Sequence, residues 1–356
     1  MSSSVPPAPF SRRSFLASLG AAGAASLGAA GGLANSAHAV SGSRSRGKDP
    51  VILGSGRHRY EWVEGWAKLP AGLSFGNTHG TIATDSKDRV YVNTDTANAV
   101  MVFERDGSYV GSWGKDWAGG LHGMVLRKEA DGEFLYLSHI GRSEFLKATL
   151  SGEVVWVKGW PQSSGLYKEQ GQFRPTSIAV APDGRIFVAD GYGLSYVHRY
   201  DAKGEYLGSF GGRGGEPGKM QTPHGLWIDT RGAVPRLIVC DRENHRLQIF
   251  SLDGELLEVR KEELRRPCNA HELNGDLVVA DLTGRITILD RWNLLVAHLG
   301  EQPEEGLRAQ NGVPAEKWQP GIFLSPHGAH WDQHGDLYVM DWNFLGRVNK
   351  LRRVQG

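Results

Sequence analysis

The sequence predicts an all-β chain folded as a six-bladed β-propeller. The first observation is a pattern that occurs six times, in which two apolar runs flank a polar turn, as in "TSIAVAPDGRIFVAD" and "HGAHWDQHGDLYVMD". The second is its period of roughly 45 to 50 residues, the length of one four-stranded blade. The third is the abundance of glycine, 48 residues in all, as many tight turns require. A β-sandwich is the alternative, but it would not repeat the same residue types at one fixed period.

Each copy predicts four short strands. Asp-Gly and His-Gly pairs are expected to supply the positive φ of tight turns. Third strands such as "RLQIFSLDG" and fourth strands such as "YLGSFG" follow most copies. The last copy ends at its third strand, "GRVNKLRRV", and residues 60–69, "YEWVEGWAKL", resemble the missing fourth. We expect this N-terminal strand to pair with blade six and close the ring, which removes the exposed sheet edges.

The first residues predict export. Residues 11–16 read "SRRSFL", a Gly/Ala/Leu run continues to Leu33, and "SAHAV" offers a signal peptidase site after Ala39. A membrane anchor and a flexible tail are the alternatives, but the run is only weakly apolar. We therefore assign residues 1–39 to a twin-arginine signal peptide, 40–59 to a linker and 60–356 to the propeller. The twin-arginine export machinery would be a partner, and the mature chain would be periplasmic or secreted, without a stable membrane span.

Charge and cysteine content limit the partners. Without residues 1–39 the chain keeps 38 basic and 39 acidic residues. This balance gives no reason to expect a nucleic-acid partner, so we expect a small-molecule or peptide substrate. In an oxidising compartment the two cysteines, Cys240 and Cys268, could pair or stay free, and the sequence leaves both possibilities open.

Three His-Gly pairs recur at even intervals in "GLHGMVLR", "TPHGLWID" and "SPHGAHWD". Their histidines, His122, His224 and His327, are 102 and 103 residues apart. They begin blades two, four and six, so they should lie about 120° apart around the channel. Three imidazoles that leave a position open are a common catalytic zinc arrangement, although another divalent transition metal would also fit. The alternative is that His-Gly merely suits the turn.

The same position in the other blades is expected to hold His79 in blade one, Thr176 or Ser177 in blade three, and His271 in blade five. His79 and His271 could be substrate contacts, groups that orient the metal ligands, or structural histidines.

Three motifs in the order "ADGYG", "PHG" and "DRENHR" resemble the NHL-repeat propeller of peptidyl-α-hydroxyglycine α-amidating lyase. The resemblance implies zinc at the three histidines, Tyr192 as the base and Arg242 as a partner of the substrate carboxylate or of the tyrosine. It implies cleavage of a carbinolamide to an amide and glyoxylate. A nearby cation and guanidinium would stabilise the phenolate that this requires. Otherwise Tyr192 is an ordinary channel aromatic, and Arg242 forms a salt bridge with Asp190 or Asp241.

The chain departs from that family at three positions. Thr94 stands where the family has a second arginine, Gly328 replaces a calcium-binding acid, and Gly193 replaces a cysteine. We therefore predict neither that calcium site nor those disulfides.

The leading hypothesis is an exported zinc-dependent lyase. The alternative is a non-catalytic NHL propeller that binds a ligand or a protein partner. A six-bladed lactonase fits less well, because its hard cation favours oxygen ligands. The connection "GEQPEEGLRAQNGVPAEKWQP" is long enough to cover the channel or to be decoration.

Overall fold

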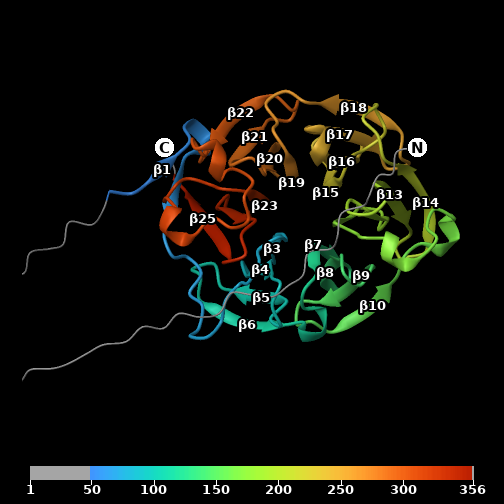
Figure 1. Ribbon diagram of the computed structural model, residues 1–356, viewed down its shortest axis with the longest axis horizontal. Coiled ribbons are helices and arrows are strands. Elements are labelled where there is room, and N and C mark those ends of the chain that lie inside the picture. The colour runs from blue at the N-terminus through green and yellow to red at the C-terminus, as the bar shows by residue number, and fades with distance from the viewer. Residues whose placement is uncertain (1–48, 355–356) are drawn as a thin grey trace, which may run out of the picture. The chain divides into compact units, whose positions relative to one another are not determined.

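The computed structural model describes residues 49–354, which form six antiparallel sheets arranged around a central channel (Figure 1). The predicted six-bladed propeller is thereby confirmed. Blade one holds β3 (Ile82–Thr84), β4 (Val90–Asn93), β5 (Val100–Phe103) and β6 (Tyr109–Trp113). Blade two holds β7 (Leu121–Glu129), β8 (Gly132–His139), β9 (Glu144–Thr149) and β10 (Val154–Lys158).

The next three blades repeat this order from the channel outward. Blade three holds β11 (Ser177–Val180), β12 (Ile186–Ala189), β13 (Tyr196–Tyr200) and β14 (Tyr206–Gly211). Blade four holds β15 (Pro223–Asp229), β16 (Arg236–Asp241), β17 (Arg246–Ser251) and β18 (Leu256–Arg260). Blade five holds β19 (Pro267–Leu273), β20 (Asp276–Asp281), β21 (Arg285–Leu289) and β22 (Leu295–Leu299).

Blade six combines both ends of the described chain. It holds β23 (Pro326–Trp331), β24 (Leu337–Asp341), β25 (Arg347–Arg353), β2 (Tyr60–Val63) and β1 (Ile52–Leu53). β2 pairs antiparallel with β25, from Tyr60 opposite Arg353 to Val63 opposite Lys350. The strand stops short of the predicted residue 69, because the chain turns at Gly65 with φ +61° and Trp66 packs into blade one instead.

The signal peptide and residues 40–48 of the linker lie outside the described residues. Within the rest of the linker, β1 adds a fifth strand to blade six. Between residues 49 and 354 the helices are single 3-10 turns, and none could span a membrane. These turns are η1 (Gly56–His58), η2 (Lys115–Trp117), η3 (Gln162–Ser164), η4 (Gln170–Gln172), η5 (Arg242–Asn244), η6 (Glu305–Leu307) and η7 (Ala315–Lys317).

The hydrophobic core lies between the faces of neighbouring blades. Ala83 and Tyr91 of blade one pack with Met124 and Leu135 of blade two, and each of these side chains is at most 5% exposed. Similar clusters join the other neighbouring blades. Burial of apolar surface at these contacts is the main force that holds the ring together.

In each of four blades, a buried aspartate fixes the segment that leads into the first strand. Asp190 directly follows β12, and Asp241, Asp281 and Asp341 are the last residues of β16, β20 and β24; all four are fully buried. Each accepts backbone N–H groups from the segment just before the first strand of its own blade, as Asp241 does from Gln221 at 2.7 Å. The recurring aspartate of the sequence pattern therefore holds the segments that carry the channel residues.

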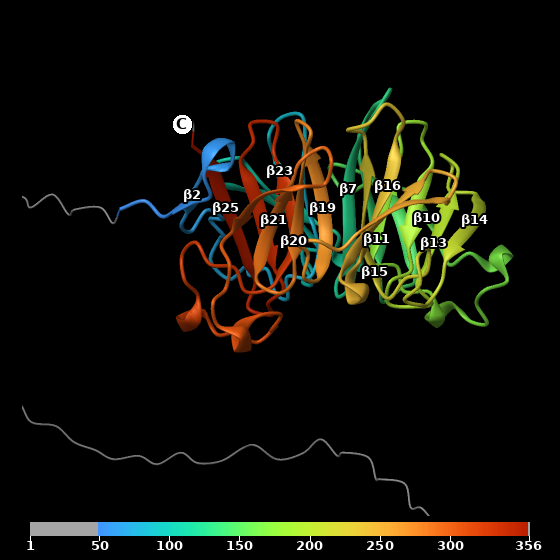
Figure 2. The same ribbon diagram turned by 90° about the horizontal axis from the view of Figure 1, so that it is seen from above.

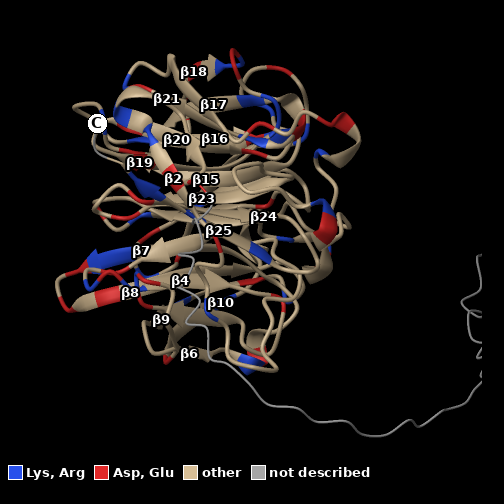
Figure 3. Cartoon of the chain, turned by 90° about the vertical axis from the view of Figure 1, so that its left-hand side faces the viewer, with Lys and Arg blue, Asp and Glu red and all other residues tan. Residues whose placement is uncertain are grey.

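The long connections β10–β11 and β22–β23, green and orange in Figure 2, project from the same face of the ring. Cys240 and Cys268 are both buried and free. Lys and Arg positions are interspersed with Asp and Glu positions along the chain in Figure 3, and in the β7–β8 hairpin Lys128 is paired opposite Glu133.

Candidate metal centre and substrate cavity

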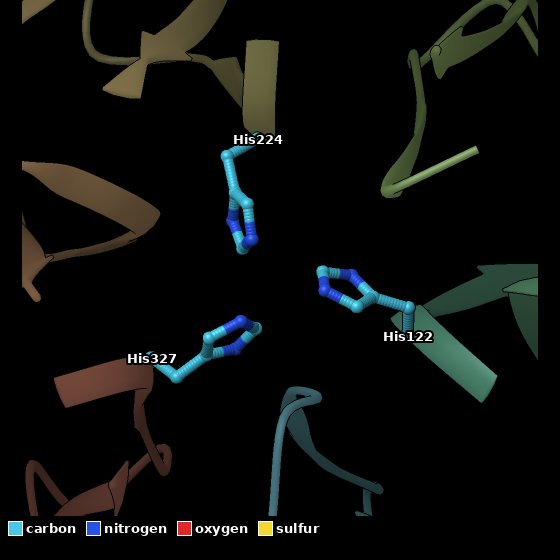
Figure 4. A group of neighbouring side chains, drawn as sticks. All are labelled: His122, His224 and His327. Atoms are coloured by element: carbon cyan, nitrogen blue, oxygen red, sulfur yellow. The ribbon is translucent and has the colours of Figure 1, made fainter. Parts of the chain in front are cut away.

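The three predicted histidines occupy equivalent β-bulges. His122, His224 and His327 are the second residues of β7, β15 and β23, and the register of each strand shifts at that residue. A bulge leaves its extra residue outside the ladder and redirects the side chain. All three imidazoles consequently point to the channel axis, as Figure 4 shows.

The glycine after each histidine has a reason other than the predicted one. Gly123, Gly225 and Gly328 do not have a positive φ, so the turn explanation is wrong for these pairs. The backbone of the next blade approaches too closely for a side chain. A Cβ on Gly225 would lie 2.3 Å from the carbonyl oxygen of Cys268, and one on Gly328 would lie 2.9 Å from that of Gly80.

The three imidazoles form a compact group. Their ring centroids are 4.6 to 4.9 Å apart, and one ring nitrogen from each lies within 4.8 Å of the others. Each of these side chains is buried. The group could therefore hold a metal ion, and we call it the three-histidine site.

Backbone carbonyl groups orient the rings. Nδ1 of His122 lies 2.6 Å from the carbonyl oxygen of Thr176, and the corresponding distances are 2.9 Å from His224 to Cys268 and 3.0 Å from His327 to Gly80. A carbonyl oxygen only accepts, so each Nδ1 carries the hydrogen and each Nε2 presents its lone pair. Histidine ligands of metals usually donate their second nitrogen in this way.

The carbonyl groups that accept these hydrogen bonds also complete the sixfold pattern. Strand register places Thr176, Cys268 and Gly80 at the bulge position of blades three, five and one. Blades with an imidazole thus alternate with blades that supply a carbonyl oxygen.

Burial keeps the imidazoles neutral. It lowers the pKa of His327 to about 3, and it lowers the pKa of His122 and His224 well below the ordinary value, with further lowering by neighbouring histidines and Arg242. Nε2 of His122 is buried and has no hydrogen-bond partner among residues 49–354. An unsatisfied lone pair of this kind fits a metal ligand.

Tyr192 and Arg242 lie beside this site, as the resemblance implied. The hydroxyl of Tyr192 is 3.0 Å from Nε2 of His224, and because that nitrogen is unprotonated the hydroxyl donates. Nη1 of Arg242 donates to the same oxygen at 3.4 Å. The salt bridge of Arg242 is with Glu243, not with Asp190 or Asp241, so that alternative is wrong.

Burial raises the pKa of Tyr192 above its ordinary value, while Arg242 opposes the shift. Burial alone would lower the pKa of Arg242, but Cys268 and Tyr192 raise it, so the guanidinium stays charged. A cation in the three-histidine site would further favour the phenolate.

A cavity of about 400 Å³ lies beside the three-histidine site and is lined by His327, Tyr192 and Arg242. We call it the rim cavity. Its wall includes the residues that follow the second strands of the blades: Asp95, Ile140, Tyr192, Arg242, Leu282 and Trp342. The rest of the wall includes Asn77, His79, Gly119, Arg266 and Asn311.

Two predicted positions need correction. Register places Gly80 and Cys268, not His79 and His271, at the bulge positions of blades one and five. His79 still lines the rim cavity, 5.5 Å from the ring of His122, and contacts Asp95. His271 instead packs between Trp227 and His330 in a separate cavity, away from the three-histidine site.

Thr94 does not reach the rim cavity. It takes the place of the buried aspartates of other blades and bonds to the carbonyl oxygen of Asn98 at 2.8 Å. Its neighbour Asp95 occupies the position that Arg242 has in blade four.

Sequence reasoning missed Asp95, Arg266, Asn77 and Asn311. The position after each second strand would have identified Asp95. The proline shared by "TPH", "SPH" and "RPC" would have aligned Cys268 with the histidines and Arg266 with the rim. Asn77 and Asn311 lie in irregular connections and have no such signal.

Comparison with known proteins agrees with this architecture. The chain is 29% identical over 180 residues to a probable peptidyl-α-hydroxyglycine α-amidating lyase of Caenorhabditis elegans, covering 49% of this chain and 47% of that protein. It is 29% identical over 187 residues to the mouse (Mus musculus) NHL repeat-containing protein 3, covering 49% and 53%. The chain thus spans about half the length of these relatives. No family model matches.

Solved structures support the fold alone. A gluconolactonase from Xanthomonas campestris has a TM-score of 0.57 at 16% identity, covering 86% of this chain and 95% of that one. A streptogramin B lyase has a TM-score of 0.54 at 13% identity, covering 79% and 96%. The chain is a six-bladed β-propeller that resembles the amidating lyases and NHL-repeat proteins in sequence.

Proposed function

We propose that this chain is a zinc-dependent lyase that cleaves carbinolamides of the peptidyl-α-hydroxyglycine type to an amide and glyoxylate. The observation that carries the proposal is the hydrogen bond between Tyr192 and His224, which puts a phenol at the three-histidine site. The named amidating-lyase relative supports the same reaction class.

The residues fit a zinc ion. Three neutral imidazoles present Nε2 lone pairs, their Nδ1 atoms are fixed by carbonyl groups, and no carboxylate belongs to the group among the described residues. Such a donor set suits zinc and leaves room for a substrate oxygen. When bound there, zinc would act as a Lewis acid that acidifies the substrate hydroxyl.

Tyr192 handles the proton. As the phenolate, it removes the proton from the hydroxyl of the carbinolamide. The electron pair of that O–H bond forms the carbonyl group of glyoxylate, and the C–N bond breaks with its electrons on nitrogen. Tyr192 then returns the proton to that nitrogen, which gives the amide. No oxidant or reductant is needed.

Arg242 has two tasks in this scheme. Its charge stabilises the phenolate, because Nη1 lies 3.4 Å from the phenol oxygen. It also lines the rim cavity, where it can bind the carboxylate of the hydroxyglycine. Export through the twin-arginine pathway to the periplasm or medium, after cleavage at residue 39, is part of the proposal.

The test is glyoxylate release. Purified mature chain, loaded with zinc, is incubated with an N-acyl-α-hydroxyglycine, and glyoxylate is measured against the spontaneous rate. We expect zinc-dependent release of glyoxylate that His224→Ala abolishes. The control His334→Ala, at an exposed histidine, should preserve it. Release no faster than the spontaneous rate would instead favour a propeller that binds a ligand or protein without chemistry.

A further inference from the structure

The rim cavity is lined by polar atoms that lack partners. Oδ1 of Asn77 and Asn311 and Nε of Arg266 are buried and form no hydrogen bond among the described residues, and the buried Oδ1 of Asp95 contacts only Nε2 of His79, at 3.2 Å. Nearly all buried polar atoms in proteins are paired, so three such atoms in one wall, beside a carboxylate with a single contact, point to a polar ligand.

The acceptors gather on the side of blades six and one. The backbone of Thr78, next to Asn77, bonds to the carbonyl oxygen of Asn343 at 3.0 Å, and the carbonyl oxygen of Asn311 accepts from Phe344 at 3.2 Å. Both asparagines are therefore fixed beside the same turn of blade six. Asp95 follows the second strand of blade one.

The donors come from blades four and five. Glu243 bridges Arg242, at 2.8 Å, and Arg266, at 2.6 Å, and so holds the two guanidinium groups side by side. Each has further N–H groups for a ligand. Paired guanidinium groups of this kind favour a carboxylate.

Asp95 and Arg242 occupy equivalent positions in blades one and four, three blades apart, so they face each other across the channel. The side chain of Asp95 is 30% exposed, and its contact with His79, at 3.2 Å, is its one ion pair within residues 49–354. A carboxylate therefore faces a guanidinium across the cavity.

From this arrangement we infer that the rim cavity recognises a small zwitterion, a free aminoacyl compound whose ammonium group binds Asp95 and whose carboxylate binds Arg242 and Arg266. An ammonium group has three donors, and Asp95 with the two asparagine oxygens supplies three acceptors. A cavity of about 400 Å³ has room for a dipeptide-sized molecule. The inference rests on the proposed function only in placing the reaction in this cavity. It predicts that the substrate is a short aminoacyl-α-hydroxyglycine with a free amine.

Binding tests this without turnover. L-alanylglycine and N-acetyl-L-alanylglycine lack the hydroxyl and are not cleaved, and calorimetry gives their Kd values for the zinc-loaded chain. We expect the free amine to bind about tenfold more tightly, the scale of one charge-assisted hydrogen bond. Asp95→Asn and Asp95→Ala should bring the ratio of the two Kd values towards one, whereas the exposed substitution Asp131→Asn should keep it.

Equal Kd values for the two peptides, no binding of either, or an unchanged ratio in both Asp95 variants would overturn the inference. Tight, Asp95-dependent binding without glyoxylate release from any carbinolamide would refute the proposed lyase and leave the recognition intact. Glyoxylate release from N-acyl compounds with no preference for a free amine would support the proposed lyase and refute the recognition of a zwitterion.

Discussion

The phenol oxygen of Tyr192 lies 3.0 Å from Nε2 of His224. Because Nδ1 of His224 donates to Cys268, this nitrogen accepts from the phenol. A metal ion at the three-histidine site would compete for the same lone pair. Metal binding would then release the phenol from its acceptor and leave its oxygen beside the cation, where a base is required.

The first prediction concerns that hydroxyl. Tyr192→Phe keeps the ring that packs 5.2 Å from His122 and 5.6 Å from His224, but removes the proton acceptor. We expect glyoxylate release to fall about 10²- to 10⁴-fold, the range for loss of a general base. The zinc content should stay at the wild-type value. Wild-type turnover by this variant would remove Tyr192 from the mechanism.

The second prediction concerns the charge of Arg242. Its guanidinium lowers the pKa of Tyr192 against the effect of burial. Arg242→Gln should raise that pKa, so less phenolate forms at a given pH. The rising, acid-side limb of kcat against pH should move to higher pH by about one unit or more. Arg352→Gln removes an exposed charge on another face and is the control, and a limb that stays in place in Arg242→Gln would argue against this role.

The third prediction concerns stability against pH. Burial lowers the pKa of His198 to about 3, while the unfolded chain binds a proton near the ordinary value of about 6.5. Between these values the unfolded state holds more protons, so acidification lowers the free energy of unfolding. The contribution is up to about 1.4 kcal/mol per pH unit below 6.5.

His198→Gln removes this contribution. We expect its free energy of unfolding, measured in denaturant, to fall about 2 kcal/mol less than that of the wild type between pH 6.5 and 5. The variant also loses contacts with Tyr167 and Ser209, so it should be less stable at pH 7. Equal losses on acidification in both proteins would show that His198 is not the group responsible.

The fold could be predicted because every blade repeats the same strands and turns. The same periodicity identified His122, His224 and His327, since equivalent positions in alternate blades must converge on the axis. The periodicity gave wrong residues in blades one and five, because Gly80 and Cys268 occupy the bulge position there. The alignment of the repeats places the nearby His79 and His271 at this position instead.

The rest of the rim cavity depends on features that do not repeat. Asn311 belongs to the irregular β22–β23 connection, and the alignment of Arg266 with Glu243 depends on how two blades meet. The sequence also could not show why a glycine follows each histidine. The reason is the close approach of the neighbouring blade, such as that of Cys268 to Gly225, and this distance is set by packing between blades.

The most direct test of the account is the metal content of the purified protein. Inductively coupled plasma mass spectrometry should find about one zinc per chain after zinc loading and removal of the excess. The metal should be lost in His224→Ala and retained in His334→Ala, whose histidine is 44% exposed on the surface. If the loaded wild-type protein retains no transition metal, the three-histidine site is not a metal centre and the proposed lyase mechanism is wrong.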